Sequence, residues 1–188
     1  MKHDLRIAVT KKMIRDALLQ LLEDTPLERI TVSRLCDLSG VNRTTFYRHY
    51  QTLQDVLREQ EAEFLRNAPR PASAPKTMAE AQSYLETICT YFYENARLTR
   101  LLVLSHTDTD LLEEMHRFCR SCLELRKAEL PAPMIDEDTR KAVFALIGGG
   151  VHCLLRQWIL GQFHMTPGQV AQILCSVIRW PRLSDLSK

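Results

Sequence analysis

The chain has 188 residues, 45% of them hydrophobic, and its 25 Lys and Arg residues nearly balance 23 Asp and Glu residues, for a formal net charge of +2. This length suffices for one domain of about 100–150 residues plus a smaller one. The small charge excess gives no support to a protein that coats polyanions by bulk electrostatics. No apolar run has the roughly 18 residues of a membrane span, and residues 1–9 lack a signal-peptide core. We therefore expect a cytoplasmic protein that does not bind membranes.

Residues 1–9 predict a short arm, and Thr10 is the expected cap of a first helix. Apolar side chains then recur at i, i+3, i+4, i+7 and i+8, which predicts an amphipathic helix with one buried stripe. The stripe consists of Ile14, Ala17, Leu18, Leu21 and Leu22. Pro26 disfavours helical geometry just before it and ends this helix. Leu27 and Ile30 are expected to hold the following loop on the core.

Residues 31–50 predict two short helices joined by a tight corner. Thr31 and Asn42 are the expected N-caps, since their side-chain oxygens can accept a free backbone N–H. Gly40 stands at the corner, where a positive φ favours glycine. The inward side chains are expected to be Val32, Leu35, Cys36 and Leu38 on the first helix and Phe46 and Tyr50 on the second. This pattern is a helix-turn-helix with residues 42–50 as the recognition helix.

The outward side chains of this second helix are hydrogen-bond donors or carry methyl or aromatic groups, and no acid occurs from Leu38 to Gln54. Arg can pair with guanine, Thr can contact a thymine methyl or a phosphate, and Tyr and His can reach backbone oxygens. The alternative is an ordinary helical hairpin with a solvated basic face. We favour double-stranded DNA as the ligand. The predicted DNA contacts are Thr31, Ser33, Arg34, Asn42, Arg43, Thr44, Thr45, Tyr47, Arg48, His49 and Thr52.

Residues 10–58 resemble the DNA-binding domain of the TetR/AcrR family of transcription regulators. The resemblance rests on the amphipathic first helix and on the segments Pro-Leu-Glu-Arg-Ile-Thr-Val, Leu-Ser-Gly-Val-Asn and Thr-Thr-Phe-Tyr-Arg-His-Tyr. It implies a recognition helix that binds the major groove of a palindromic operator. One position departs from the family: after the capping residue, here Thr52, the family usually has a Lys that reaches a phosphate, and this chain has Leu53.

A fourth helix is expected from a capping box at Thr52 and Asp55 to about residue 66. Residues 67–77, with three prolines, predict a linker rather than a partner-binding segment. The expected domains are thus residues 1–58 and 78–188, and the fold class is all-α. Further helices are predicted over residues 79–95, 97–105, 108–130, 136–161 and 169–180, with a break at residues 131–133. Thr166 is the expected N-cap of the last helix, with Pro167 at its first position.

Gly148, Gly149 and Gly150 lie inside a predicted helix, where each costs roughly 1 kcal/mol relative to Ala. Close packing at a subunit interface is the preferred compensation, and ligand contact is the alternative. The last two helices carry more apolar surface than one small domain hides, so we expect a homodimer built on a four-helix bundle. The predicted dimerisation residues are Ile147, Val151, Leu154, Trp158, Val170, Ile173, Leu174 and Val177. This region loosely resembles a TetR subgroup of low-GC Gram-positive bacteria that includes an activator of dihydroxyacetone-kinase genes.

The six cysteines are expected to be reduced core residues; they are Cys36, Cys89, Cys119, Cys122, Cys153 and Cys175. His116, Cys119 and Cys122 share one helical face. A metal or redox sensor there is disfavoured, because one helix face cannot enclose a tetrahedral ion and no second Cys pair has zinc-ribbon spacing. The sequence predicts neither a metal site nor a cofactor.

The spacing of nucleophiles, bases and carboxylates supports no catalytic site, so we expect no enzyme. The family resemblance implies a repressor that a small apolar effector releases. A pocket for that effector could be lined by aromatic and His side chains, although residues at this spacing are more often core; they are Tyr91, His106, Phe118, His152 and Trp158. Two alternatives stay open: a coactivator that depends on a protein partner and lacks a ligand, and a small-molecule-processing protein with a vestigial DNA-binding head.

Overall fold

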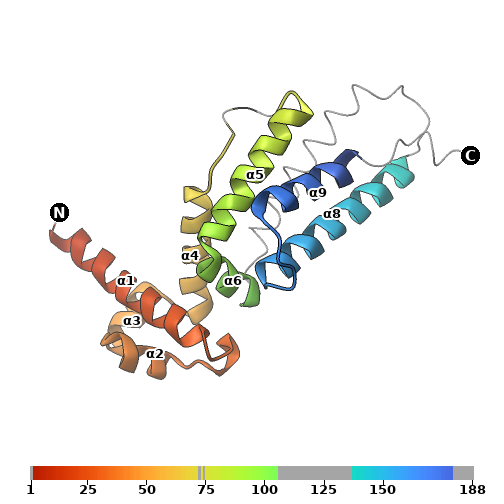
Figure 1. Ribbon diagram of the computed structural model, residues 1–188. Helices are drawn as coiled ribbons and strands as arrows, with labels where there is room; N and C mark the ends of the chain where they lie inside the picture. The colour runs from red at the N-terminus through yellow and green to blue at the C-terminus, as the bar shows by residue number, and fades with distance from the viewer. Residues whose placement is uncertain (1, 72, 74, 106–136, 180–188) are drawn as a thin grey trace, which may run out of the picture. The chain divides into compact units, whose positions relative to one another are not determined.

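The computed structural model describes residues 2–71, 73, 75–105 and 137–179, and within these ranges every regular element is a helix (Figure 1). The all-α prediction is confirmed. The elements are α1 (Lys2–Leu22), the 3₁₀ helix η1 (Leu27–Arg29), α2 (Val32–Ser39), α3 (Arg43–His49), α4 (Leu53–Asn67), α5 (Met78–Glu94), α6 (Ala96–Leu104), α8 (Glu137–Ile159) and α9 (Pro167–Arg179).

These helices form two compact units, which we call unit 1 (α1–α4 and α6) and unit 2 (α5, α8 and α9). The first boundary between the units lies after residue 67, at the end of α4, and α6 belongs to unit 1. The predicted helix at 108–130, the break at 131–133 and residues His106, His116, Phe118, Cys119 and Cys122 lie outside the described residues. In the described ranges, no helix is long and apolar enough to cross a membrane.

Unit 1 closes a core of its own between α1, η1, α2, α3 and the start of α4. The predicted stripe of α1 enters it, since Ile14 and Leu18 are almost fully buried and Ala17 and Leu21 are buried as well. Leu27 and Ile30 complete the same cluster, as expected. Leu38 is an exception: the sequence placed it inward, but 45% of it is exposed, because it lies on the outer side of α2 beyond the packed pair Leu35 and Cys36.

The start of α1 differs from the prediction. The helix begins at Lys2 rather than after Thr10, because no Pro or Gly interrupts residues 2–9. The Thr10 hydroxyl donates to the Arg6 carbonyl oxygen (2.9 Å), which satisfies it inside the helix. The predicted arm is therefore two further turns of α1.

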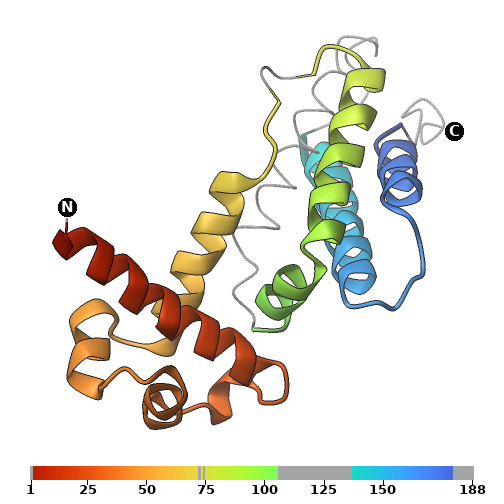
Figure 2. The same ribbon diagram turned by 60° about the vertical axis from the view of Figure 1, so that its left-hand side comes forward.

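Unit 2 packs α5 against α9, with α8 beside α9, and the three helices run side by side in both views (Figures 1 and 2). The predicted inner face of α5 is confirmed, because Ala81, Leu85, Ile88, Cys89 and Phe92 are all buried. Gly168 allows a close approach, since a Cβ added there would lie 3.1 Å from the Glu86 Oε1 atom of α5.

The cap predicted for the last helix is confirmed. Thr166 Oγ1 accepts from the Gln169 N–H (3.3 Å), and Gln169 Oε1 accepts in return from the Thr166 N–H (2.9 Å). α9 thus begins with a closed capping box that uses Gln as its second member. At the other end of the connection, Gly161 has φ +80° and ends the preceding α8.

Three of the described cysteines, Cys36, Cys89 and Cys175, are buried, as expected. Burial, the main cause, raises the pKa of the Cys36 thiol, so this group is poorly reactive. The prediction for Cys153 was wrong, because this residue is exposed rather than part of the core. Its Sγ accepts a hydrogen bond from the Gln157 amide (3.0 Å) on the outer side of α8.

Candidate nucleic-acid interface

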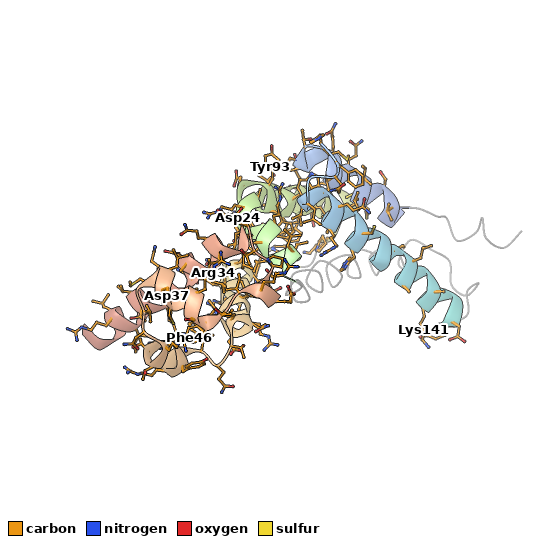
Figure 3. The ribbon with its side chains drawn as sticks, turned by 90° about the horizontal axis from the view of Figure 1, so that it is seen from below. Asp24, Arg34, Asp37, Phe46, Tyr93 and Lys141 are labelled. Atoms are coloured by element: carbon orange, nitrogen blue, oxygen red, sulfur yellow. The ribbon has the colours of Figure 1, made fainter. Side chains whose placement is uncertain are left out.

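The recognition helix α3 is held at both ends. Asn42 Oδ1 accepts from the Thr45 N–H (2.8 Å) at its start, as predicted, and the Tyr50 N–H donates to the Phe46 carbonyl oxygen (2.9 Å) at its end. Gly40 has φ +69°, which confirms the left-handed corner before it. Phe46 is completely buried and Tyr50 almost so, with their ring centroids 6.0 Å apart. These two rings fix which side of α3 faces the core (Figure 3 labels Phe46).

The opposite side of α3 presents donors to solvent. Arg43, Thr44, Tyr47 and Arg48 are exposed, and Thr45 and His49 are half-buried. Tyr47 is 57% exposed although its ring meets Phe46 edge-on at 5.3 Å. The first turn of α3 has no acidic residue, and Arg48 and His49 lie in its last turn. This face can therefore approach phosphates and base edges without like-charge repulsion.

Three of the predicted DNA contacts are also helix caps. Besides Asn42, Thr31 Oγ1 accepts from the Arg34 N–H and Thr52 Oγ1 accepts from the Asp55 N–H, both at 3.2 Å. In each case the cap uses an oxygen lone pair, so the hydroxyl or amide hydrogen can still be donated to a phosphate. These residues thus fix the helix starts and can position the protein on a backbone at the same time.

The capping box at the start of α4 is confirmed, with Asp55 in the place of the usual Glu. Asp55 Oδ2 accepts from the Thr52 N–H (2.7 Å) and from the Gln51 N–H (3.1 Å). The bond from the Thr52 N–H, the largest cause, holds the pKa of this carboxyl below its ordinary value. The two predicted contacts on α2 differ in exposure, because Ser33 is half-buried whereas Arg34 is exposed and its Nη1 lies 3.4 Å from Thr25 Oγ1.

Leu53, the position that departs from the family, is 7% exposed and belongs to the core of unit 1. Its side chain is packed with Val56 and Leu57 in that core rather than extended into solvent. It provides neither a positive charge nor the reach of a Lys, so a phosphate contact from this side chain is absent.

A network that sequence reasoning missed lies behind the recognition helix. Lys11 Nζ of α1 donates to both carboxylate oxygens of Glu59 on α4 (3.0 and 2.8 Å) and lies 5.2 Å above the Tyr50 ring. The Glu59 carboxylate also faces the Tyr50 hydroxyl. One turn further along both helices, Arg15 pairs with Glu63 at 2.7 Å. The available signal was two bases four apart on one helix and two acids four apart on another.

The titration behaviour of this network follows from its burial and bonding. Burial raises the pKa of the Tyr50 hydroxyl, and the Glu59 carboxylate raises it further. Burial alone would also raise the pKa of Glu59. The hydrogen bonds from Lys11 and the neighbouring Tyr50 hydroxyl outweigh that effect, and the pKa of Glu59 lies below its ordinary value. Glu59 is therefore ionised and Tyr50 neutral at physiological pH.

The structure describes three of the five residues predicted to bind an effector. Tyr91 and His152 are half-buried, and burial raises the pKa of Tyr91. Trp158 is buried, stacks on Tyr93 with ring centroids 6.3 Å apart, and donates its indole N–H to the Met165 carbonyl oxygen (2.9 Å). His106 and Phe118 lie outside the described residues. The effector pocket stays a prediction.

The predicted dimerisation residues divide into two groups. Five are buried within the subunit itself: Ile147, Val151, Trp158, Val170 and Leu174. Leu154 and Val177 are half-buried, and Ile173 is 37% exposed.

Among the described residues, one side of α8 is open; the sequence placed Gly149 and Gly150 of this side at an interface but did not assign Leu146 or Cys153 to it. Leu146 is 77% exposed, and a Cβ added to Gly149 or Gly150 would meet nothing within 4 Å. Cys153 extends this surface by one turn. We call these four residues the open face of α8.

Residues 79–179, more than half of the chain, match the TetR-type family model described as a transcriptional regulator C-terminal region. The fold is similar to a crystal structure of a TetR transcriptional regulator from Streptococcus agalactiae 2603V, with 24% identity, a TM-score of 0.67 and coverage of 95% of this chain and 98% of that chain. It is also similar to the dihydroxyacetone kinase operon activator DhaS, with 14% identity, a TM-score of 0.57 and coverage of 90% and 94%, respectively. The chain matches none of the curated proteins.

The helix-turn-helix and the helical C-terminal region together define a DNA-binding transcriptional regulator. The chain belongs to the TetR family, which confirms the resemblance drawn from residues 10–58 and the helix-turn-helix at residues 31–50.

Proposed function

We propose that this protein is a homodimeric, cytoplasmic repressor that binds a palindromic operator and is released by a small apolar effector. The outward face of α3 is the observation that carries the proposal. It combines exposed Arg43, Tyr47 and Arg48 with a capped start, a buried anchor at Phe46 and no acidic residue in its first turn. Two such helices in successive major grooves require half-sites about 34–36 Å apart.

Within each half-site, the exposed side chains of α3 are assigned to base edges and the capping residues to phosphates. Arg43 and Arg48 suit guanine, and the Thr44 and Thr45 methyl groups suit thymine. Thr31, Asn42 and Thr52 donate to the backbone beside the groove, together with Ser33, Arg34 and His49. Because Leu53 is buried, affinity depends on these contacts without the family's usual Lys.

The open face of α8 supports the homodimer. Leu146, Gly149 and Gly150 form an apolar and small-residue surface on which a helix from a second copy can approach closely. Ile173, Leu154 and Val177 add partly exposed apolar surface from α8 and α9. The glycines cost helix stability within the subunit, and close packing in the dimer compensates for that cost.

We place the effector in unit 2, where Tyr91 and His152 are the half-buried residues assigned to it. An effector releases DNA only if it binds one conformation of the dimer more tightly than the other. The second candidate function is a coactivator that responds to a protein partner instead. This second candidate shares the sign of regulation in the name of DhaS, an operon activator of similar fold.

Selection of bound duplexes from a random pool, followed by anisotropy titrations at two salt concentrations, tests the proposal. The expected result is a short palindrome bound by a dimer, with affinity that falls as salt rises. Absence of any preferred sequence would contradict it. Dissociation by small apolar compounds supports the repressor, whereas sensitivity only to an added protein supports the coactivator.

A further inference from the structure

The outward side of α2 carries one acidic side chain beside two predicted DNA contacts. The core side of this helix consists of Leu35, Cys36 and Ser39. On the other side, Arg34 and Asp37 are exposed and Ser33 is half-buried (Figure 3 labels Arg34 and Asp37). Asp37 follows Ser33 by four positions and Arg34 by three, and residues at these spacings are neighbours on a helix, with Cβ atoms about 5–6 Å apart. A phosphate bound by Ser33 and Arg34 is therefore close to the Asp37 carboxylate as well.

No base in the described ranges compensates the negative charge of Asp37. Neither an ion pair nor a side-chain hydrogen bond joins it to another described residue. The guanidinium of Arg34 is directed elsewhere, since its Nη1 lies 3.4 Å from Thr25 Oγ1. By contrast, three other acids of unit 1 form ion pairs with bases on a different helix: Glu23, Glu59 and Glu63.

The position of Asp37 within α2 gives it no stabilising role. α2 ends at Ser39, so the carboxylate lies near the C-terminal end of the helix, where the helix dipole disfavours an anion. The next residues, from Leu38 to Gln54, contain no acid, so Asp37 is the last acid before the recognition helix. Stability therefore does not explain a negative charge here, and its consequence falls on DNA binding.

That consequence is repulsion from the DNA backbone. A carboxylate and a phosphate this close repel each other with little screening, because their distance is below the Debye length of about 8 Å at physiological ionic strength. The backbone is chemically the same in every duplex, so the repulsion weakens binding to all sequences by a similar factor. The base contacts of α3 still decide between sequences.

We propose that Asp37 limits the affinity of this protein for DNA, because its unpaired carboxylate opposes the phosphate contacts of Ser33 and Arg34. Stable binding then depends on the base contacts of α3, which random duplexes offer only in part. Asp37 sets how tightly any duplex is held and leaves the sequence preference to α3. This inference rests on the part of the proposed function that places Ser33 and Arg34 at the DNA backbone.

The test measures anisotropy of the selected operator and of a scrambled duplex with wild type, Asp37→Asn and Asp37→Lys, at about 50 mM and about 200 mM salt. At low salt, Asp37→Asn should tighten binding of both duplexes about three- to tenfold, and Asp37→Lys should add a similar factor. The gain should shrink at high salt, where screening is stronger. The ratio of the two dissociation constants should stay within about twofold of the wild-type ratio.

Glu28→Gln and Glu28→Lys are the matched controls. Glu28 is an exposed acid on η1, where none of the predicted DNA contacts lies, and it too has no ion pair with another described residue. These variants make the same changes in charge, and they should alter the affinity for either duplex by less than about twofold.

Equal effects at the two positions would overturn the inference, because net charge alone would then explain them. Unchanged affinity in Asp37→Asn would overturn it too, and so would weaker operator binding, which would make the carboxylate a favourable contact. The scrambled duplex separates this inference from the operator. If no operator is selected but Asp37→Asn still tightens scrambled binding, the proposed function fails and the inference stands. If the wild type binds neither duplex, both fail.

Discussion

Unit 1 and unit 2 differ in how completely the described residues of one chain bury the apolar faces of their helices. In unit 1 the apolar stripe of α1, the paired anchors Phe46 and Tyr50, and Leu53 all close on one core. Among the described residues of unit 2, α5 buries its predicted face against neighbours, but α8 leaves Leu146 largely exposed beside two uncovered glycines. Unit 1 thus buries its apolar residues within one chain. The described part of unit 2 keeps an exposed surface of the kind that a second copy would bury.

The largest expected effect tests whether the two units are independently stable. Phe46→Ala removes a completely buried ring and should cost unit 1 about 3–5 kcal/mol. Unit 2 should keep its helices and its self-association, so thermal unfolding followed by circular dichroism is expected to split into two transitions. Phe163→Ala, at a ring that is 37% exposed in unit 2, is the matched control. A single transition shifted as a whole would show that the units unfold together.

The second effect concerns DNA binding without a loss of fold. Tyr47→Ala combined with Arg48→Ala removes two exposed side chains of α3 and should lower operator affinity by about 100-fold or more, at about 1–3 kcal/mol for each base contact. Sedimentation should still show the dimer, and the melting temperature should stay unchanged. Arg29→Ala removes an exposed charge on η1 and serves as the control. Loss of the dimer in the double variant would mean that these residues are structural.

The third effect concerns the open face of α8. There, one substitution is expected to stabilise the isolated subunit and to weaken the dimer. In an isolated subunit, Gly150→Ala should stabilise α8 by about 1 kcal/mol, since the added Cβ meets nothing within 4 Å. If a second copy packs there, the same Cβ weakens association by about 1–3 kcal/mol. We expect the dimer dissociation constant to rise about tenfold. Ultracentrifugation over a range of concentrations measures it, and tighter association would exclude this face as the interface.

The smallest effect depends on pH. The carboxyl of Asp55 has a pKa below its ordinary value of 3.8 because it accepts the Thr52 N–H, so its contribution to stability is present above that value and is lost as pH falls through the lower folded pKa. Asp55→Ala should therefore cost about 1 kcal/mol at pH 6 and progressively less below about pH 4. Urea unfolding between pH 3 and pH 7 measures this. A difference that does not change with pH would assign the effect to packing instead.

The sequence predicted unit 1 almost residue by residue because its signals are local. Thr31, Asn42 and Thr52 each cap the helix expected of them, and Gly40 has the left-handed φ that its position required. The predictions for Leu38 and for the start of α1 were wrong. A single apolar residue does not establish burial, and a lone Thr does not establish where a helix starts. The Lys11–Glu59–Tyr50 network could not be predicted, because it joins residues 48 positions apart by tertiary packing.

Unit 2 was harder to predict at the level of its surface. The apolar period of α8 correctly predicted a helix. It could not distinguish positions buried within the subunit, such as Val151, from apolar positions that stay exposed on it. Leu146 and Cys153 are exposed although they are apolar or small, and neither had been assigned to an interface. A periodic apolar pattern predicts that one face of a helix is buried. It does not predict whether the same chain or a second chain buries it.

The length of α1 has a consequence for backbone opening. Its 21 residues span about 31 Å at 1.5 Å per residue, yet the core stripe begins only at Ile14, and Leu5 and Val9 of the first half are mostly exposed. A helical segment with little packing frays readily. Deuterium should therefore replace the amide hydrogens of residues 6–10 early, while those of residues 18–22 should exchange only when the whole of unit 1 opens.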